Sequence, residues 1–431
     1  MATPHPTDRP LTHNIRPGEP PLDLAGYERA GGYQGLRKAL KTLAPTDVMQ
    51  AVTDAKLRGR GGAGFPTGNK WSFVPRGKDA PHPRYLIVNA DEMEPGTFKD
   101  RLLLEGDPHQ MIEGAIVSAY AIEAEIAYIF VRGEYTLAIE RLERAAAEAA
   151  ERGYLGRNIL GTAFSLELHV HSSAGRYICG EETALLTSLE GQRAIPRAKP
   201  PYPQAAGVWG RPSVVNNVET LCNVPHIVCH GAEWFRGLSR GLDAGTKIYG
   251  ASGRVKRPGA WELPMGTPLG ELLEEHAGGM CEGFRLRALL PGGASTGFLT
   301  PEHLDVAMDF SSVEKVGSRL GTGALIVLDD RTCPIGMLRN LEHFFAQESC
   351  GWCTPCRDGL PWVERLLAAI EAGEGELRDL EILEMHTQFL GMGKTFCAHA
   401  PGAMAPLETG LKYFREDFER HIAQKGCPWR H

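Results

Sequence analysis

Three cysteines are spaced two residues apart in the stretch ESCGWCTPCR (348 to 357), and a fourth follows in KTFCAHAPGA (394 to 403). The C-x2-C-x2-C run of Cys350, Cys353 and Cys356 lets one short loop supply three thiolates to a compact inorganic centre. The sequence CRDG after the third cysteine lacks the nearby fourth cysteine of bacterial ferredoxins, so Cys397 is the candidate fourth ligand. One [4Fe-4S] cluster is the simplest interpretation of this pattern.

A structural zinc site with four thiolates is the alternative interpretation, although zinc sites more often use two C-x2-C pairs. Each cysteine segment leads into an apolar helical pattern, and we expect Pro361 and Pro406 near the first turns of these two helices. A helix N-terminus directed at a negatively charged cluster is favourable, and Arg357 and Lys394 add positive charge nearby.

A second group of possible ligands lies in CNVPHIVCH, where Cys222, His226, Cys229 and His230 could share one helical face. Pro225 and the apolar neighbours favour an ordinary packed helix over a metal site.

The stretch LRGRGGAGFPTGNKW (57 to 71) contains a formal G-x-G-x-x-G pattern. A dinucleotide-binding turn should follow a strand, whereas the preceding TDVMQAVTDAKL has helical spacing, so this is a different glycine-rich loop. Its glycines allow backbone N–H groups to approach a phosphate or an aromatic ring closely. A flexible loop without a ligand is the alternative. Three basic residues could contribute positive charge: Arg58, Arg60 and Lys70.

Further polar groups follow predicted strands and helix starts. The stretch NADEMEPGTFKDR (89 to 101) follows a strand, where its acids and amide could accept hydrogen bonds from ribose or a flavin, or simply form a solvated turn. Glu181 and Glu182 in YICGEETALLTSLEG stand in a first helical turn, which acids stabilise without any ligand. Asn216 and Asn217 in VVNNVETL offer more donors and acceptors than an apolar helix start needs.

The elements that must position these residues alternate between residues 85 and 190. We expect strands in RYLIVNA, IAYIFVRG and SLELHVH, and helices over 107 to 123 and 135 to 152. This alternation predicts a parallel α/β sheet, in which ligands collect beyond the carboxyl ends of the strands. Residues 245 to 325 have the short strands and turns of a small α+β insert. From about 335 the sequence becomes helical, with two apolar stripes: Leu360, Val363, Leu366, Leu367 and Ile370, then Leu407, Leu411, Phe414, Phe418 and Ile422.

Bulk properties limit the class of protein. A chain of 431 residues is long enough for two or three domains, and its net charge of −7 gives no electrostatic reason to expect nucleic-acid binding. The opening MATPHPTDRPLTHNIRPGEPP has no apolar core, so we expect an irregular arm and no signal peptide. The most apolar stretch, 111 to 131, is interrupted by Glu113, Glu123 and Glu125 and cannot span a bilayer. We therefore expect a reducing compartment, where the ten cysteines are buried, metal-bound or catalytic.

Six motifs in register resemble those of the NADH-binding flavoprotein subunit of respiratory complex I, the NADH:quinone oxidoreductase. They are RGRGGAGFPTGNKW, NADEMEPGTFKDR, CGEETALL, KPPYP, NNVETL and ESCGWCTPCRDG. The resemblance runs from about Leu57 to the last helix. It implies an α/β FMN-binding domain with a parallel sheet, a ubiquitin-like β-grasp insert and a C-terminal helical bundle that carries one [4Fe-4S] cluster. The implied boundaries are an N-terminal arm over 1–32, the FMN/NADH domain over 33–240, the insert over 241–330 and the cluster domain over 331–431.

The resemblance also implies the site residues. FMN would be lined by Gly61, Gly62, Lys70, Asn89, Asp91, Glu92, Gly180, Asn216, Asn217 and Thr220. NADH would be positioned by Phe65, Phe73, Glu94, Glu182, Lys199 and Tyr202. The cluster ligands would be Cys350, Cys353, Cys356 and Cys397. Two departures from the family pattern stand out: Tyr202 replaces a common Phe, and CAHAPGA follows the fourth cysteine, which makes His399 a minor rival ligand.

The implied chemistry is hydride transfer from NADH to FMN, followed by single-electron transfer to the cluster, with no general acid or base in the protein. A thioredoxin-like [2Fe-2S] subunit and a larger iron–sulfur subunit would be the partners, on the cytoplasmic face of the membrane and without insertion into it. Two alternatives are a diaphorase subunit of a soluble NAD-linked hydrogenase or formate dehydrogenase, and a non-enzymatic zinc-stabilised nucleotide-binding scaffold.

Overall fold

The computed structural model of the chain describes residues 9–77 and 79–429, which form two compact units. The first unit contains the described residues of Met1–Met93, with Phe98–Ile248 and Glu262–Gly266. The second contains Glu94–Thr97, Tyr249–Trp261 and the described residues of Thr267–His431. A four-stranded parallel sheet lies in the first unit, and each unit has its own helices.

The sheet of the first unit has the strand order β3-β2-β1-β4, and all neighbouring strands are parallel. Its strands are β1 (Tyr85–Ala90), β2 (Ile126–Val131), β3 (Glu167–Ser172) and β4 (Ser213–Asn217). The connections include α6 (Pro108–Ile122) between β1 and β2, and α7 (Thr136–Glu151) between β2 and β3. The three predicted strands and the two predicted helices are all present. The predicted parallel α/β fold is confirmed.

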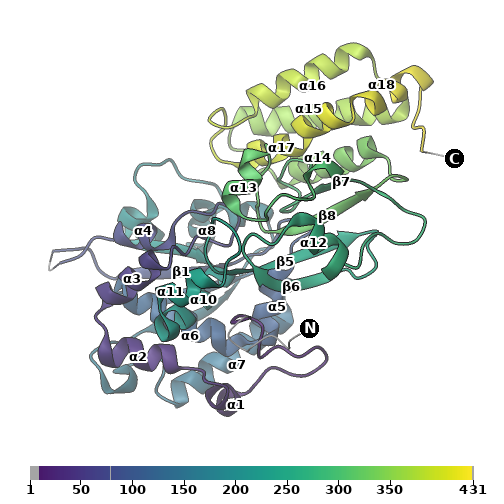
Figure 1. Ribbon diagram of the computed structural model, residues 1–431. Coiled ribbons are helices and arrows are strands. Elements are labelled where there is room, and N and C mark those ends of the chain that lie inside the picture. Colours follow the sequence, from purple (N-terminus) through teal and green to yellow (C-terminus); the bar gives the residue numbers. More distant parts are fainter. Residues whose placement is uncertain (1–8, 78, 430–431) are drawn as a thin grey trace. The chain divides into compact units, whose positions relative to one another are not determined.

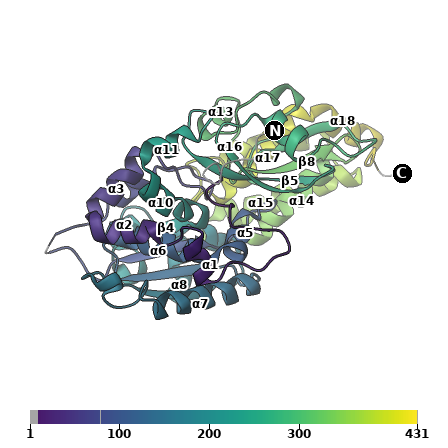
Figure 2. The same cartoon turned by 60° about the horizontal axis from the view of Figure 1, so that its bottom comes forward.

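Both faces of this sheet are covered, as parallel sheets require. Successive side chains of a strand point to opposite faces. Tyr85 and Ile87 of β1 belong to one buried cluster with Leu185 and Leu186 of α8 (Glu182–Leu189). Leu86, which alternates with them, is also buried, and helices α6 and α10 (Val218–His230) contact β1. Figures 1 and 2 show these helices beside the sheet.

Among the described residues, the remaining helices of the first unit are short. They are α1 (Leu24–Arg29), α2 (Gln34–Thr42), α3 (Pro45–Asp54), α4 (Thr67–Ser72), α5 (Lys99–Gly106), α9 (Pro203–Ala206), α11 (Ala232–Gly237) and three 3-10 turns, Ile159–Gly161, Tyr177–Gly180 and Val208–Gly210. Helix α1 lies within the segment expected to be an irregular arm. Leu11 from that segment is fully buried, and its N–H donates to the carboxylate of Glu262 at 3.0 Å.

Helix α10 carries the residues CNVPHIVCH and is a packed helix despite the internal Pro225. Cys222 is buried, and Nε2 of His226 hydrogen bonds the side-chain oxygen of Gln110 at 2.8 Å.

A second sheet has the strand order β6-β5-β8-β7. Its strands are β5 (Thr246–Gly253), β6 (Gly259–Pro264), β7 (Leu286–Leu290) and β8 (Ala324–Asp329), and β5 runs parallel to β8 whereas β7 is antiparallel to it. Figure 2 shows β5 beside β8. Short helical segments accompany these strands: α12 (Leu269–Glu271), a π-helical turn Leu272–His276, a 3-10 turn Pro301–His303 and α13 (Phe310–Lys315).

The C-terminal part of the second unit is helical, as predicted, and forms the green to yellow helices of Figure 1. It contains α14 (Pro334–Glu348), α15 (Thr354–Ala372), α16 (Leu377–Phe389), α17 (His399–Tyr413) and α18 (Arg415–Gln424). Leu360, Val363 and Leu367 of α15 are fully buried, which is the first predicted stripe. The second stripe is divided at Phe414, where α17 ends and α18 begins.

The expected helix starts are wrong. Pro361 and Pro406 lie inside α15 and α17, because both helices begin close to the cysteines. Cys353 is the N-cap of α15, and Pro355 occupies the first turn, where the missing N–H of proline costs nothing. The sequence pattern favoured Pro361 and Pro406 as first-turn residues because a proline inside a helix is normally unfavourable.

Among the described residues, no helix is both long enough and apolar enough to cross a lipid bilayer.

A buried carboxyl in α14 generates a prediction about stability. Glu342 is fully buried, and neither of its carboxyl oxygens has a hydrogen-bond partner among the described residues. Burial, reinforced by the charge of Glu364, raises the pKa of Glu342 well above 4.5. When the pKa of an acid is higher in the folded protein than in the unfolded chain, the protein is most stable below the unfolded pKa. The free energy of unfolding then falls as the pH rises toward the folded pKa.

Glu342→Met should therefore stabilise the protein, by about 1 to 3 kcal/mol at pH 8, and by less at pH 5. The measurement is the melting temperature of both proteins at the two pH values. Glu374→Met, which changes an exposed side chain, serves as the control. An equal rise in melting temperature at both pH values would contradict the raised pKa of Glu342.

Candidate functional site

An open cleft of about 1010 Å³ lies in the first unit, next to the glycine-rich loop. Its volume is at the upper end of the range for small-molecule sites. The lining residues come from four parts of the chain: Gly59, Gly61, Ala63, Gly64, Phe65, Lys70 and Phe73; Asn89; Gly180, Glu181, Glu182, Lys199, Pro200, Pro201, Tyr202, Gln204 and Ala205; and Val215, Asn216, Asn217 and Thr220.

The polar floor of the cleft is built at the carboxyl ends of β1 and β4. In their parallel register Asn89 pairs with Asn217, and Val88 pairs with Asn216. Both strands end at the same edge of the sheet, which is where ligands of open parallel sheets bind. Two stretches more than a hundred residues apart therefore deliver three amide side chains to one site.

Each of these amides is held by a hydrogen bond. Nδ2 of Asn89 donates to the carbonyl of Gly180 at 3.0 Å. Nε1 of Trp71, a fully buried ring, donates to Oδ1 of Asn216 at 2.9 Å. Nδ2 of Asn217 donates to Oδ2 of Asp100 at 2.6 Å. The amide orientations are thus set by the protein before any ligand binds.

A buried charge network supports Asn217. Nζ of Lys99 lies 2.7 Å from Oδ1 of Asp100 and 2.9 Å from Oε2 of Glu219, and it donates to Oδ1 of Asn217 at 3.3 Å. Nζ of Lys247 also reaches Oε2 of Glu219, at 3.2 Å. Burial lowers the pKa of Lys247 to about 8. Burial alone would raise the pKa of Glu219, but Lys247 and Lys99 outweigh it, and the pKa is lowered.

The glycine loop approaches this floor closely. A Cβ on Gly61 would lie 3.0 Å from Cβ of Asn217, closer than most real contacts. The N–H of Arg60 donates to Oγ1 of Thr220 at 2.8 Å, which fixes the loop on α10. Glycine at 61 is needed here for close backbone approach.

The two arginines of the loop do not line the cleft, contrary to the charge expected of them. Arg58 pairs with Asp243 at 2.8 Å. The guanidinium of Arg60 is buried and donates to the carbonyls of Ala244 and Thr246 at 2.7 and 3.1 Å. Of the three basic residues only Lys70 is in the lining. The arginines satisfy carbonyls and a carboxylate within the fold, which spacing alone cannot reveal.

Glu182 lies between two lysines of the cleft. Its Oε2 is 2.7 Å from Nζ of Lys70, and its Oε1 is 2.6 Å from Nζ of Lys199. Burial by itself would raise the pKa of Glu182, but the two ammonium groups outweigh it and the pKa is lowered. The carboxylate is therefore ionised at neutral pH and holds both lysines in place.

Three large aromatic side chains of the lining are exposed. The exposed fractions are 48% for Phe65, 60% for Phe73 and 57% for Tyr202. Aromatic rings left in water beside a cleft offer surfaces on which a flat ring can stack.

Four residues expected at the site are not in the lining. Gly62, with φ +125°, is not among the lining residues. Oδ1 of Asp91 accepts from the hydroxyl of Ser173 at 2.7 Å. Oε1 of Glu94 accepts from the N–H of Ser295 at 2.6 Å, within the second unit.

The fourth of them, Glu92, caps the start of α5. Its carboxylate accepts from the N–H groups of Asp100 and Arg101 at 2.9 and 3.1 Å and from the hydroxyl of Tyr135 at 3.0 Å. Burial, followed by the charge of Asp100, raises the pKa of Glu92 to about 7.

The structure adds lining residues that sequence reasoning missed, among them Glu181, Gln204 and Ala205. Glu181 is the N-cap of α8, and its carboxylate accepts from the N–H groups of Thr183 and Ala184. Glu181 could have been predicted from the motif CGEETALL, because it stands directly beside Glu182. Gln204 follows KPPYP directly, so the end of that motif could have been extended by two residues.

The four candidate cluster ligands come from two segments of the second unit. Cys353 is the N-cap of α15, Cys356 lies in its first turn, and Cys397 stands just before α17. Burial, together with smaller effects of the nearby thiols of Cys353, Cys397 and Cys350, raises the pKa of the Cys356 thiol to about 12. The other three thiols are thus close enough to affect the pKa of Cys356, and four thiolates are the donor set of a [4Fe-4S] cluster.

The rival ligand His399 has another partner. Its Nε2 donates to the carbonyl of Phe345 at 2.8 Å, and its ring contacts Phe345 edge to face.

Three family models match the chain. Residues 52–226 match the Nuo51 FMN-binding domain, residues 250–299 match an SLBB domain, and residues 336–421 match the iron–sulfur binding region of NADH-ubiquinone oxidoreductase-F.

Similar proteins match over nearly the whole chain. The F subunit of the NADH-quinone oxidoreductase of Escherichia coli is 57% identical over 419 residues, which are 97% of this chain and 94% of that protein. The corresponding protein of Salmonella typhimurium has the same identity and coverage. The F subunit of the Mycobacterium bovis enzyme is 49% identical over 406 residues, covering 94% of this chain and 90% of that protein.

A solved structure of an NAD⁺-reducing [NiFe]-hydrogenase, in the air-oxidised state, is also similar. It superimposes with a TM-score of 0.78 at 38% identity. The match covers 88% of this chain but only 63% of the hydrogenase chain. A chain of an NAD⁺-reducing hydrogenase is therefore a relative of this protein.

The close contact at Gly61 predicts the effect of an added methyl group. Gly61→Ala should weaken FMN binding about tenfold or more, because the loop or Asn217 must move away from the floor of the cleft. The measurement is FMN affinity by quenching of flavin fluorescence. Gly237→Ala, where an added Cβ meets nothing within 4 Å, is the matched control and should keep the original affinity. Equal affinity of all three proteins would place FMN elsewhere.

Proposed function

Because the chain belongs to the family of the F subunits of NADH-quinone oxidoreductase, we propose that its cleft binds FMN and NADH side by side. The predicted family, the oxidoreductase activity and the cofactors are confirmed: the chain oxidises NADH through FMN and a [4Fe-4S] cluster. A non-enzymatic zinc-stabilised scaffold is thereby excluded as the function. The diaphorase alternative is retained only in the sense that an NAD⁺-reducing hydrogenase chain is a relative of this protein.

The observation that carries the proposal is the composition of the cleft. Small residues and amides meet at the strand ends, while exposed aromatic rings stand at the same cleft. We assign the FMN side to Gly61, Lys70, Asn89, Gly180, Asn216, Asn217 and Thr220. We assign the NADH side to Phe65, Phe73, Glu182, Lys199 and Tyr202.

Gly62, Asp91, Glu92 and Glu94 also came from the resemblance, and we propose supporting roles for the first three. Glu92 holds the start of α5, and Asp100 of that helix holds Asn217. Asp91 stands two residues after Asn89, whose Oδ1 accepts from the N–H of Asp91 at 3.2 Å. These two acids would act by positioning the amides. Gly62 would act by giving the loop its turn.

FMN held in the cleft would supply the ability to accept a hydride from NADH and to give up its two electrons one at a time. The protein supplies the binding surfaces. The asparagines orient the flavin, the aromatic rings offer stacking surfaces for adenine, and Cys350, Cys353, Cys356 and Cys397 hold the cluster.

We further propose that a thioredoxin-like [2Fe-2S] subunit and a larger iron–sulfur subunit receive the electrons, on the cytoplasmic face of the membrane. Large apolar side chains next to the cysteines support a docking surface. Trp352 and Phe396 are exposed, and their rings contact each other at 6.4 Å between centroids. Exposed rings beside a redox centre are typical of a surface that a partner covers.

The test of the function is an anaerobic visible spectrum of the purified protein before and after addition of NADH, with NADPH as the comparison. Flavin and iron–sulfur absorbance should bleach with NADH and barely with NADPH. A protein that carries both absorbances but does not bleach with NADH would contradict the assigned donor.

Rejection of NADPH should depend on Glu182. With its carboxylate removed, Lys70 and Lys199 keep their charge and can attract a 2′-phosphate. Glu182→Gln should raise the kcat/KM ratio of NADPH to NADH about tenfold or more, since about 1.4 kcal/mol of differential binding gives a factor of ten. Glu167→Gln, an exposed change on β3, is the control. An unchanged ratio in Glu182→Gln would remove Glu182 from donor selection.

A further inference from the structure

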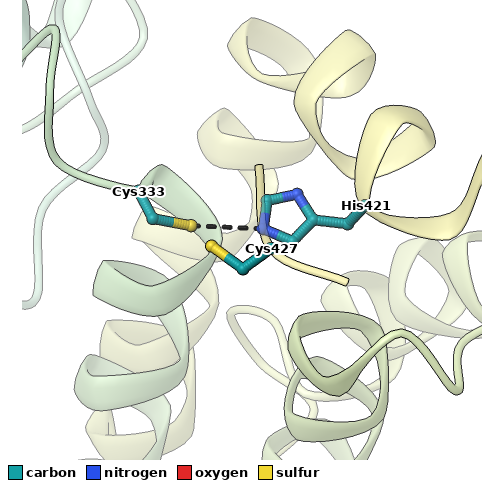
Figure 3. Close-up of side chains that lie close together, drawn as sticks. All are labelled: Cys333, His421 and Cys427. Carbon is teal, nitrogen blue, oxygen red and sulfur yellow. Dashed lines mark hydrogen bonds between the residues drawn. The ribbon is translucent and has the colours of Figure 1, made fainter. Parts of the chain in front are cut away.

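Three possible metal ligands converge in the second unit, away from the C-x2-C-x2-C run. Cys333 is the N-cap of α14, His421 lies in the last turn of α18, and Cys427 follows that helix. Their ligand atoms all lie within 4.8 Å of one another, and Sγ of Cys333 is 3.3 Å from Nε2 of His421. Figure 3 shows the two sulfur atoms and the imidazole directed toward one point.

The imidazole is oriented as a metal ligand would be. Nδ1 of His421 lies 2.7 Å from the carbonyl oxygen of Asp417. A carbonyl can only accept, so Nδ1 carries the proton and Nε2 presents its lone pair to the two thiols. The indole of Trp429 stacks on the ring at 5.7 Å and 20°, which limits its rotation. A backbone carbonyl on the second nitrogen is the usual support of a metal-binding histidine.

The first thiol lies at the start of a helix, where a backbone N–H is directed at its sulfur. Sγ of Cys333 accepts from the N–H of Gly336 at 3.3 Å, at the start of the fifteen-residue helix α14. The N-terminus of a long helix stabilises a negative charge.

The second thiol, that of Cys427, lies near His421 because the chain reverses its direction after α18. After α18, Lys425 adopts φ 49°, and the N–H of Gly426 donates to the carbonyl of His421 at 3.1 Å. This is the bond pattern that reverses the chain after a helix. The turn packs on Gly373, the residue directly after α15, where an added Cβ would lie 2.1 Å from the backbone of Lys425. Cys427 is thereby returned to the end of its own helix, beside His421.

We propose that Cys333, His421 and Cys427 bind one zinc ion, which ties the C-terminal segment to the start of α14. Two thiolates and a neutral imidazole are a soft donor set that suits Zn²⁺ in a tetrahedral site, with the fourth position left to water. The two thiolates neutralise the ion, so the partly buried site needs no other counter-charge. Cys333 and Cys427 both lie outside residues 336–421, the range that matches the iron–sulfur region.

The experiment is elemental analysis of the full chain, purified anaerobically with its FMN and iron, after incubation with one equivalent of zinc and gel filtration. We expect about one zinc per chain. Zinc K-edge absorption should show sulfur at about 2.3 Å and nitrogen at about 2.0 Å. This signal is specific for zinc and is not obscured by the iron cluster.

Two variants and one control separate this site from the cluster. Cys427→Ser changes a residue outside any helix, and Cys333→Ser keeps a good helix cap while it removes the thiol. Both should lose the zinc and keep their iron and FMN, which also reports correct folding. Cys281→Ser, outside both cysteine groups, should retain zinc. Absence of zinc from the unchanged protein, equal zinc in Cys427→Ser, or a Cys333–Cys427 disulfide in the anaerobic protein would each overturn the proposal.

Discussion

The parallel pairing of β1 with β4 is the constraint on which the cleft depends. Its register sets Asn89 opposite Asn217 at the carboxyl edge of the sheet, although the two residues are far apart in the chain. A shift of one residue would turn these amides to the other face. The glycine loop then closes on this edge, because Gly61 leaves room for Asn217 and the backbone of Arg60 bonds Thr220.

Beneath the amides, the fold holds charges where water is excluded. Lys99, Asp100, Glu219 and Lys247 form a buried network whose members neutralise one another. Such networks contribute little net stability compared with apolar packing, but they are costly to break. Here the network also donates to and accepts from Asn217, so its integrity is linked to the orientation of a residue at the cleft. The buried guanidinium of Arg60 fixes the loop in the same way, by satisfying carbonyls.

In the second unit, helix starts position the thiols. Cys353 is the N-cap residue of α15 and Cys333 that of α14, so both cysteines stand where an ordered helix begins. Helix N-termini favour negative charge, which suits thiolates bound to a cluster or to an ion. Next to these cysteines, the rings of Trp352 and Phe396 are exposed and contact each other.

The sequence by itself determined the family, three of the four strands of the parallel sheet with two of its helices, the four cluster cysteines as candidates, and many of the cleft residues. The strands and helices follow from local periodicity, and the family and the site residues follow from motifs in a fixed order. The fourth strand, β4, was not predicted. Tertiary structure alone decided where the side chains of those motifs point. Arg58 and Arg60 turn into the fold, Glu92 caps a helix, and Glu182 pairs with two lysines. It also decided that Cys333 and Cys427 meet. Each of these side chains contacts residues from a distant segment of the chain, and a contact between distant segments leaves no local pattern in a single sequence.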